Sequence, residues 1–235
     1  ALLMGRKGSK GFPGKNLHPV FGKPLAYYPM RAALATPEID KTYISTDDEK
    51  LMALAEENAV GVIERPPELC TDSALGEHVY EHAYGVIRRL NPEKNIELIV
   101  LLMCNAPTVT AAMISEGINV LRANPSYDSA VSVSRYNMWS PLRARKIDSD
   151  GLLKPFVAFE TFGDPKTLNC DRDSQGDVWF ADMGVSIVRP RCLDNLEGGL
   201  LPQKWMGCNN YPLKQVGGCD GWLCIGLKGM AAYTL

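Results

Sequence analysis

Residues 1–16 read ALLMGRKGSKGFPGKN, an apolar run followed by a loop rich in glycine and positive charge. Ala1 to Met4 has the composition of the second half of a buried strand, so we expect a few residues upstream. The loop from Gly5 to Asn16 holds four glycines, three lysines and one arginine. Glycines allow positive φ and let amide N–H groups approach an anion, while the basic side chains supply charge. The segment therefore predicts a strand and a phosphate-binding loop rather than a solvated basic loop, although neither the Walker pattern nor GxGxxG is present.

Beyond this loop, apolar runs of strand length alternate with amphipathic stretches of helical length, which is typical of βαβ units. The expected strands are 1–4, 41–45, 62–63, 96–102, 129–134 and 177–188. The expected helices are 24–35, 76–90, 190–196 and 223–235. Two more are expected: one capped by residues 46–48 that runs to about 58, and one capped by Thr110 that runs to about 123. The pattern predicts an α/β fold with a doubly wound, mainly parallel, Rossmann-like sheet. Ligands bind such sheets beyond the carboxyl ends of the strands, here the loops after Met4, Ser45, Leu102 and Ser134.

The segment from Leu142 to Phe156 interrupts this alternation. Two short strand-like runs flank Asp148-Ser149-Asp150-Gly151, a sequence that favours a hairpin turn. We expect one domain over residues 1–235, with an inserted arm at about 137–175 that carries this hairpin. Leu152, Leu153 and Phe156 give the arm apolar side chains to bury against another molecule, which predicts a homodimer.

The bulk composition excludes several classes of partner. The formal net charge is −2, which gives no electrostatic reason to expect nucleic acid or an anionic membrane. Neither an apolar run of about 20 residues nor a signal peptide is evident. Seven cysteines, an odd number without CxxC spacing, are typical of reduced thiols, so we expect a cytoplasmic protein.

Three segments stand out in this order: GRKGSKGFPGKNL at 5–17, YISTD at 43–47 and RPPELCTD at 65–72. They resemble the first three motifs of the acylneuraminate cytidylyltransferases, the enzymes that make CMP-activated sialic acids and related nonulosonic acids. The resemblance is specific over about residues 1–135. It implies a nucleotidyltransferase sheet with a dimerisation arm, and an enzyme that transfers CMP from CTP to the anomeric hydroxyl of a 2-keto sugar acid, with Mg²⁺ as cofactor and pyrophosphate as product.

Site residues follow from the resemblance by matching motifs. Arg6 and Lys15 are implied to stabilise the triphosphate and the departing pyrophosphate, as catalytic residues. Asp220 matches the first of two carboxylates that coordinate magnesium in the sialic acid enzymes, but Trp222 stands where the second is expected. The residues implied to bind the nucleotide are Gly5, Gly8, Ser9, Lys10, Asn16 and Arg65.

The acceptor sugar is less well specified. Where the sialic acid enzymes have a Gln-Pro-Thr-Ser-Pro pattern, this chain has Met103-Cys104-Asn105-Ala106-Pro107, so Asn105 is the nearest polar substitute. Arginine binds carboxylates through two parallel hydrogen bonds, which makes Arg172, with Gln175 nearby, the candidate for the sugar carboxylate. Asp182 is a candidate second metal carboxylate if the fold brings it near.

Alternative functions are weaker or remain open. His78 to His82 matches HxxEH, a zinc protease signature, but without a third ligand a solvated helix face explains it better. No GxSxG or evident Cys–His pair indicates a hydrolase. A catalytically impaired, nucleotide-binding homologue acting as a regulatory or assembly subunit is the main rival, because of Trp222. The base, and the choice among sialic, legionaminic, pseudaminic and 3-deoxy-octulosonic acids, stay open.

Overall fold

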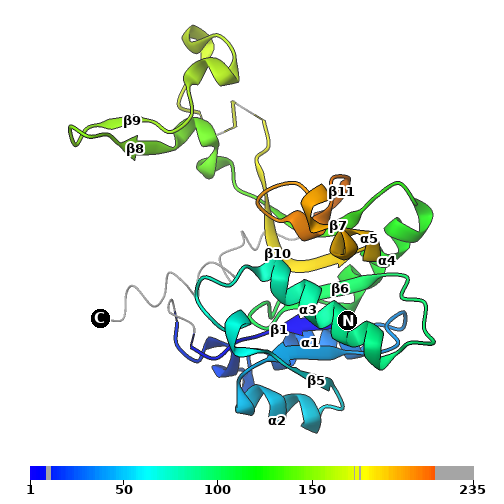
Figure 1. The fold of residues 1–235 in the computed structure, drawn as a ribbon. Helices are drawn as coiled ribbons and strands as arrows, with labels where there is room; N and C mark the ends of the chain where they lie inside the picture. Colours follow the sequence, from blue (N-terminus) through cyan, green and yellow to red (C-terminus); the bar gives the residue numbers. More distant parts are fainter. Residues whose placement is uncertain (9–11, 172, 175, 215–235) are drawn as a thin grey trace.

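A seven-stranded sheet forms the centre of the molecule (Figure 1). The computed structural model describes residues 1–8, 12–171, 173–174 and 176–214. The sheet has the order β11-β7-β10-β6-β1-β4-β5. Its strands are β1 (Leu2–Met4), β4 (Tyr43–Thr46), β5 (Gly61–Glu64), β6 (Ile99–Met103), β7 (Ser129–Arg135), β10 (Trp179–Val188) and β11 (Asn210–Lys214). Among these strands only β10 runs antiparallel to its neighbours, β6 and β7. The predicted α/β fold with a mainly parallel sheet is confirmed, and β6 is its middle strand.

Helices connect the parallel strands. They are α1 (Tyr27–Leu34), α2 (Glu49–Glu57), α3 (Gly76–Leu90), α4 (Ala111–Ala123) and α5 (Pro190–Asp194). The side chain of Asp48 caps α2 by accepting a hydrogen bond from the Lys50 amide, and Thr110 caps α4 through the Met113 amide. Short 3₁₀ turns are η1 (Lys15–Leu17), η2 (Pro67–Leu69), η3 (Asn137–Trp139), η4 (Pro141–Arg143), η5 (Phe159–Phe162), η6 (Pro165–Thr167), η7 (Leu196–Gly198) and η8 (Lys204–Met206).

Two hydrophobic cores lie on opposite faces of the sheet. Alternate residues of a strand point to opposite faces, and Leu3 and Leu2 accordingly belong to different cores. One core joins the sheet to α1, α2 and α4, and the other joins it to α3, α5 and η8. The molecule is therefore a three-layer sandwich, as a doubly wound sheet requires.

The strand order reverses between β1 and β6. From β1 the chain builds outward through β4 and β5, and it then returns to place β6 on the other side of β1. The loops that leave β1 and β6 therefore diverge at the carboxyl edge of the sheet. Such a switch point is where open α/β sheets form their ligand crevice.

The hairpin predicted between Leu142 and Phe156 is present. It consists of β8 (Arg145–Ile147) and β9 (Leu153–Pro155), a two-stranded sheet that projects away from the body of the molecule (Figure 1). A second small pair, β2 (Pro19–Val20) and β3 (Lys23–Pro24), follows the loop after β1. The division into one domain with an inserted arm stays a prediction, as does the use of the arm in a dimer.

Strand β11 was not predicted from the sequence. Its run Asn210–Lys214 contains Pro212, which removes a backbone donor and argues against a central strand. Among the strands of the described residues, β11 lies at the edge of the sheet with β7 as its one neighbour, and an edge position tolerates proline. The helix expected at 223–235 lies outside the described residues.

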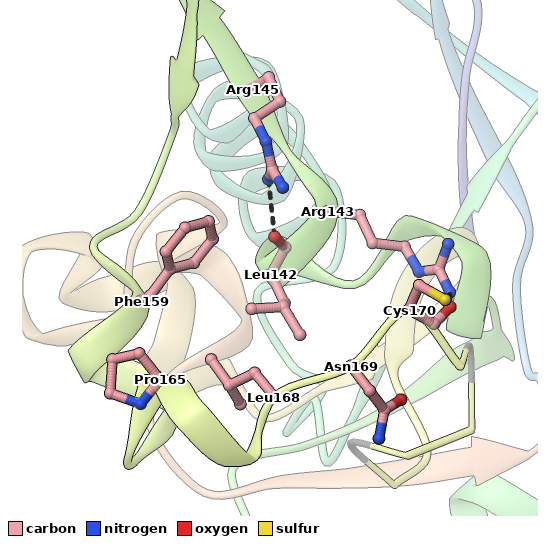
Figure 2. A pocket seen from close by; sticks show the side chains of 8 residues that line it. All are labelled: Leu142, Arg143, Arg145, Phe159, Pro165, Leu168, Asn169 and Cys170. Atoms are coloured by element: carbon pink, nitrogen blue, oxygen red, sulfur yellow. Dashed lines mark hydrogen bonds between the residues drawn. The ribbon is translucent and has the colours of Figure 1, made fainter.

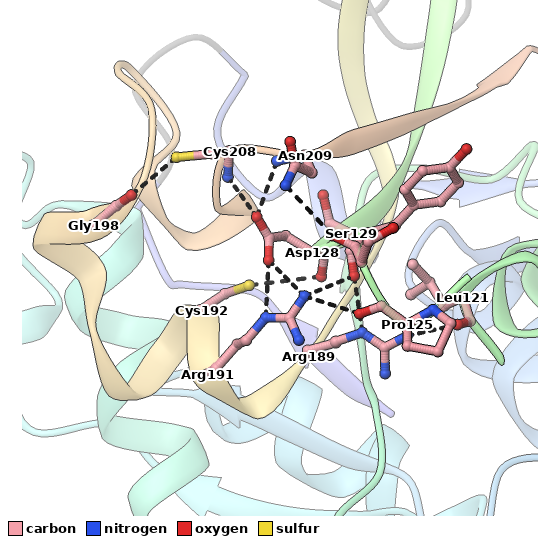
Figure 3. A network of polar contacts seen from close by, with 12 residues as sticks. Leu121, Pro125, Asp128, Ser129, Arg189, Arg191, Cys192, Gly198, Cys208 and Asn209 are labelled. Carbon is pink, nitrogen blue, oxygen red and sulfur yellow. Dashed lines mark hydrogen bonds and ion pairs between the residues drawn. The ribbon is translucent and has the colours of Figure 1, made fainter. Parts of the chain in front are cut away.

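A polar network anchors the chain that leads into β11 (Figure 3). The Asp128 carboxylate accepts hydrogen bonds from the amides of Cys208 and Asn209, both at 2.9 Å, and pairs with Arg191 at 2.8 Å. Burial by itself raises the pKa of Asp128, but these hydrogen bonds and the Arg191 charge outweigh it and hold the pKa below its usual value. Since Asp128 directly precedes β7, the network lies at the amino end of that strand and has a structural role.

No helix within the described ranges combines the length and the apolar composition needed to cross a bilayer.

Candidate nucleotide site at the carboxyl edge

The loop after β1 begins at Gly5, in a crowded space. The Gly5 amide donates to the carbonyl of Ser45, at the carboxyl end of β4, over 3.2 Å. A methyl group added to Gly5 would lie 2.8 Å from Leu51 Cδ1 and 2.9 Å from Cys104 Sγ. Contacts this short force the neighbours to move. Strand β4, helix α2 and the loop after β6 therefore meet at Gly5.

Two carboxylates hold the next residues of the loop. The Arg6 guanidinium donates to Asp72 Oδ1 over 2.6 Å and to the Cys70 carbonyl over 3.3 Å. The Lys7 amide donates to Asp47 Oδ1 over 2.8 Å. The three segments that resemble family motifs are thus bound to one another. Gly8 follows with φ of 74°, a left-handed conformation that favours glycine.

Lys15 and Asn16 lie in η1, which the left-handed Gly14 precedes. Burial raises the pKa of the Cys104 thiol to about 12, and the charges of Arg65 and Lys15 oppose that rise. Lys15 is therefore near enough to Cys104 to act on it electrostatically. Asn16 is only 6% exposed, with its amide packed against Gly5, so its proposed reading of a base or ribose edge stays a prediction.

Arg65 is buried beneath the loop. Its guanidinium donates to the carbonyls of Ser45 and Gly5, at 2.7 and 3.3 Å, and to the Ser45 hydroxyl at 3.3 Å. Desolvation lowers the pKa of Arg65, while Cys70 and Asp47 partly oppose this effect. These contacts make Arg65 a support for the backbones of β1 and β4. Direct contact with a nucleotide stays a prediction.

The loop after β6 contributes Asn105, which is half-buried at the same edge of the sheet. Met103, at the end of β6, accepts a weak hydrogen bond from the buried Tyr80 hydroxyl over 3.7 Å. Next to this loop, Asp182 of β10 accepts hydrogen bonds from the hydroxyls of Ser132 and Ser134. The structure thus brings Gly5, Arg6, Gly8, Lys15, Asn16, Arg65 and Asn105 to one edge.

Ser9, Lys10, Arg172, Gln175 and Asp220 lie outside the described residues. Their assigned roles, including Asp220 as metal ligand, stay predictions.

Metal ligands do not cluster in the described part of the chain. Within it, no group of three or more His, Cys, Asp or Glu side chains could hold an ion. His78 and Glu81 are exposed on α3, whereas His82 is half-buried and its Nδ1 atom is buried without a hydrogen-bond partner in the described part of the chain. The preference for a solvated helix face over a zinc site stays a prediction.

A cation-rich loop at the switch point of a doubly wound sheet is an arrangement that suits a phosphate-bearing ligand, and it places the chain in the class of doubly wound α/β proteins. Residues 1–186 match the sequence model of a family described as Cytidylyltransferase, and the chain belongs to that family.

Individual relatives agree with this assignment. An N-acylneuraminate cytidylyltransferase of Escherichia coli is 31% identical over 156 residues, which are 66% of this chain and 36% of that protein. A 3-deoxy-manno-octulosonate cytidylyltransferase of Maricaulis maris is 30% identical over 131 residues, 55% of this chain and 47% of that protein. The matched region therefore spans between about a third and a half of these relatives.

A solved structure of similar fold is a CMP:2-keto-3-deoxy-manno-octonic acid synthetase in complex with CTP. It aligns with a TM-score of 0.63 and 14% identity, over 100% of this chain and 98% of that one. At this identity the likeness concerns the fold alone.

Proposed function

We propose that this protein transfers CMP from CTP to the anomeric hydroxyl of a nonulosonic or sialic-acid-like 2-keto sugar acid, with release of pyrophosphate. The observation that carries the proposal is the cationic loop of residues 5–16, whose first residues, Gly5 to Lys7, bind the Asp47, Arg65 and Asp72 segments at the carboxyl edge of the sheet. Family membership supports the nucleotidyl transfer, and the named activities of the two relatives support an acidic sugar as acceptor.

In the proposed reaction the hydroxyl oxygen bonds to the α-phosphorus, the bond from that phosphorus to the pyrophosphate oxygen breaks, and the hydroxyl proton passes to solvent. Positioning and charge stabilisation account for catalysis of this kind. Arg6 and Lys15 offset the charge that develops on pyrophosphate. Gly5, Gly8, Ser9 and Lys10 hold the phosphates, and Asn16 and Arg65 contact the nucleoside.

The acceptor is proposed to lie on the side of β6. Asn105 contributes an amide at the edge of the sheet, and Arg172 with Gln175 is assigned to the sugar carboxylate. Because Met103 replaces a glutamine, the preferred acid can differ from an ordinary sialic acid.

Magnesium is proposed as the cofactor, with Asp220 as its protein ligand. It neutralises phosphate oxygens when bound, and one carboxylate with substrate phosphates and waters suffices to hold it. Since Trp222 stands at the second position, we expect activity to require unusually high magnesium and Asp220→Asn to abolish it. Saturation at low-millimolar magnesium with an unimpaired Asn variant would remove Asp220 from the site.

The working form is proposed to be a cytoplasmic homodimer. Exposed apolar side chains on the arm, namely Ile147, Leu152, Leu153 and Phe156, support the dimer, because an isolated hairpin does not bury them itself.

A different function is favoured by one feature, the replacement of the second metal carboxylate by Trp222. In this alternative the protein binds CTP without turnover and serves as a regulatory or assembly subunit.

Pyrophosphate release from CTP, measured across a panel of sialic, legionaminic, pseudaminic and 3-deoxy-octulosonic acids, tests the proposal. ATP, GTP and UTP serve as controls for the base. We expect turnover with CTP and at least one acid. Calorimetric binding of CTP without turnover of any acid would favour the regulatory alternative.

A further inference from the structure

The sheet is irregular at Asp182. Strand β10 pairs with β7 as far as Ala181 opposite Val133, and pairing resumes at Ser186 opposite Val131. Residues 182–185 of β10 therefore face the single residue Ser132 of β7. Within this bulge Met183 has φ of 63°, a conformation that a non-glycine residue rarely adopts. Bulges commonly re-aim a side chain and are over-represented next to active sites.

The bulge fixes the Asp182 carboxylate. Ser132 and the Gly184 amide donate to Oδ1, the latter over 3.0 Å, and the Ser134 hydroxyl donates to Oδ2 over 2.8 Å. The Ser132 oxygen in turn accepts from the Val185 amide over 3.0 Å. Both serines are buried, whereas Asp182 is half-buried. The carboxylate is thus held in one orientation at the margin of the core.

This carboxylate lies on the acceptor side of the switch point. Val185 pairs with Leu102 of β6, so residues 182–184 lie alongside the end of that strand and the loop after it. A methyl group added to Gly184 would lie 3.6 Å from Val109, which belongs to that same loop. Arg6 and Arg65, by contrast, lie on the β4 and β5 side of β1.

We propose that Asp182 is a specificity-determining residue that accepts a hydrogen bond from a hydroxyl group of the acceptor sugar, an inference that rests on the proposed function. A carboxylate attracts hydroxyl donors and repels a substrate carboxylate. Asp182 therefore turns the hydroxyls of the sugar toward β10 and its acid group away. Ser132 and Ser134 are positioning residues, because they hold the carboxylate without reaching the sugar.

The test compares Asp182→Asn with the unmodified protein in saturation kinetics, using CTP and N-acetylneuraminate or 3-deoxy-manno-octulosonate. We expect the KM for the acid to rise about ten- to hundred-fold, the scale of a hydrogen bond to a charged group, with the KM for CTP and half-saturation by magnesium unchanged. Glu116→Gln, which removes one exposed charge on α4, should leave all three quantities unchanged.

Acceptor analogues that lack single hydroxyls identify the partner. Compared with the intact acid, one analogue should bind the unmodified protein more weakly but bind Asp182→Asn equally well, as in a double-mutant cycle. A shift in magnesium dependence without a change in the acid KM would overturn the inference and make Asp182 a metal ligand. Lower thermal stability with unchanged kinetics would overturn it in favour of a scaffold.

Failure of the proposed function gives a separate result. If the unmodified protein turns over no acid, calorimetry with N-acetylneuraminate still compares the two proteins. Binding that Asp182→Asn weakens keeps Asp182 as a sugar ligand while the transferase activity is rejected. If the unmodified protein is active and Asp182→Asn binds the acid equally well, only the role of Asp182 is rejected.

Discussion

The two halves of the carboxyl edge are built differently. On the β1, β4 and β5 side, hydrogen bonds join the three motif segments directly, through Arg6 to Asp72, Lys7 to Asp47 and Arg65 to Gly5. On the β6, β10 and β7 side, the polar groups come from separate strands, and the hairpin of β8 and β9 extends away from the body. We call these the nucleotide half and the acceptor half.

The difference has a physical consequence for sequence divergence. In the nucleotide half Arg6, Asp47 and Arg65 bind partners in another motif, so replacement of one of them leaves a buried or charged group without that partner. In the acceptor half Met103 makes only a weak hydrogen bond, with the hydroxyl of Tyr80 over 3.7 Å, so a different side chain at this position costs little. Sequence change is thereby constrained in the nucleotide half, whereas the acceptor half is able to change.

The arm also carries a pocket of its own, lined by Leu142, Arg143, Arg145, Phe159, Pro165, Leu168, Asn169 and Cys170 (Figure 2). Arg145 lies over the Phe159 ring at 5.3 Å and donates to the Leu142 carbonyl at 2.8 Å. Arg143 donates to the Cys170 carbonyl. These contacts brace the arm internally. Its exposed apolar side chains Ile147, Leu152 and Leu153 lie on the hairpin, Phe156 directly follows it, and Met138 and Trp139 lie in η3.

The largest expected effect concerns formation of the dimer through the arm, on the acceptor half of the molecule. Ile147 and Leu153 are paired across the hairpin and are 72% and 70% exposed. A two-fold dimer buries four such side chains, so Ile147→Ser with Leu153→Ser should weaken it by about 6 kcal/mol, roughly four decades in Kd. Light scattering at micromolar concentration should show a monomer, against a dimer for the unmodified protein.

The matched control replaces the neighbouring cross-strand pair, Lys146 and Lys154, by serine. Since the contacts of the nucleotide half come from within one chain, CTP affinity should survive in the monomer. An unmodified protein that is itself monomeric would contradict the role given to the arm.

In the nucleotide half, Lys15→Ala should lower turnover about a hundred-fold or more, or about 2.7 kcal/mol, because one preorganised charge at the leaving group is lost. Lys7→Ala is the control, since only its backbone amide contacts Asp47. The measurement is pyrophosphate release by folded variants. Normal turnover in Lys15→Ala would show that the loop binds its anion by other groups.

Gly5→Ala tests whether the halves share one crowded junction. The added methyl group meets Leu51 and Cys104 at 2.8 and 2.9 Å, so the free energy of unfolding should fall by about 1–3 kcal/mol. The control is Gly76→Ala, at the start of α3. A methyl group added there meets no neighbouring side chain or loop within 4 Å, so the free energy of unfolding should be unchanged or slightly higher. Urea unfolding of both variants provides the comparison, and equal stabilities would argue against the close approach.

Local signals in the sequence predicted most elements up to residue 135. The bounds of α3 agree with the prediction, and α4 begins directly after its predicted Thr110 cap. The pairings of Arg6 with Asp72 and of Lys7 with Asp47 were not predicted, because they join residues 66 and 40 positions apart, which no local pattern encodes.

Part of the cluster around Asp182 could be predicted from the sequence. Ser132 and Ser134 lie at alternate positions of the predicted strand 129–134, and hence on one face of an otherwise buried strand, which marks a buried polar site. Its carboxylate partner depends on the bulge, and a bulge of this kind is set by pairing between distant strands.

The smallest expected effect concerns Cys104, which lies on the β6 loop beneath Gly5 and so belongs to both halves. Burial raises the pKa of this thiol from 9.0 to about 12 in the folded protein. Below pH 9 the thiol is neutral in both states and its contribution to stability is complete. Between pH 9 and 12 the unfolded chain ionises first, so stability falls, by roughly 1.4 kcal/mol at pH 10. Cys192 and Tyr80, whose pKa values burial also raises, act in the same direction.

The difference in unfolding free energy between the unmodified protein and Cys104→Ser, measured in urea at pH 8 and pH 10, therefore isolates Cys104. From pH 8 to pH 10 the unmodified protein should lose more stability than Cys104→Ser. A variant in which serine replaces the exposed Cys170 should lose as much stability as the unmodified protein. Equal losses in all three proteins would mean that water reaches the thiol, and that the junction between the two halves is more open than the contacts of Gly5 indicate.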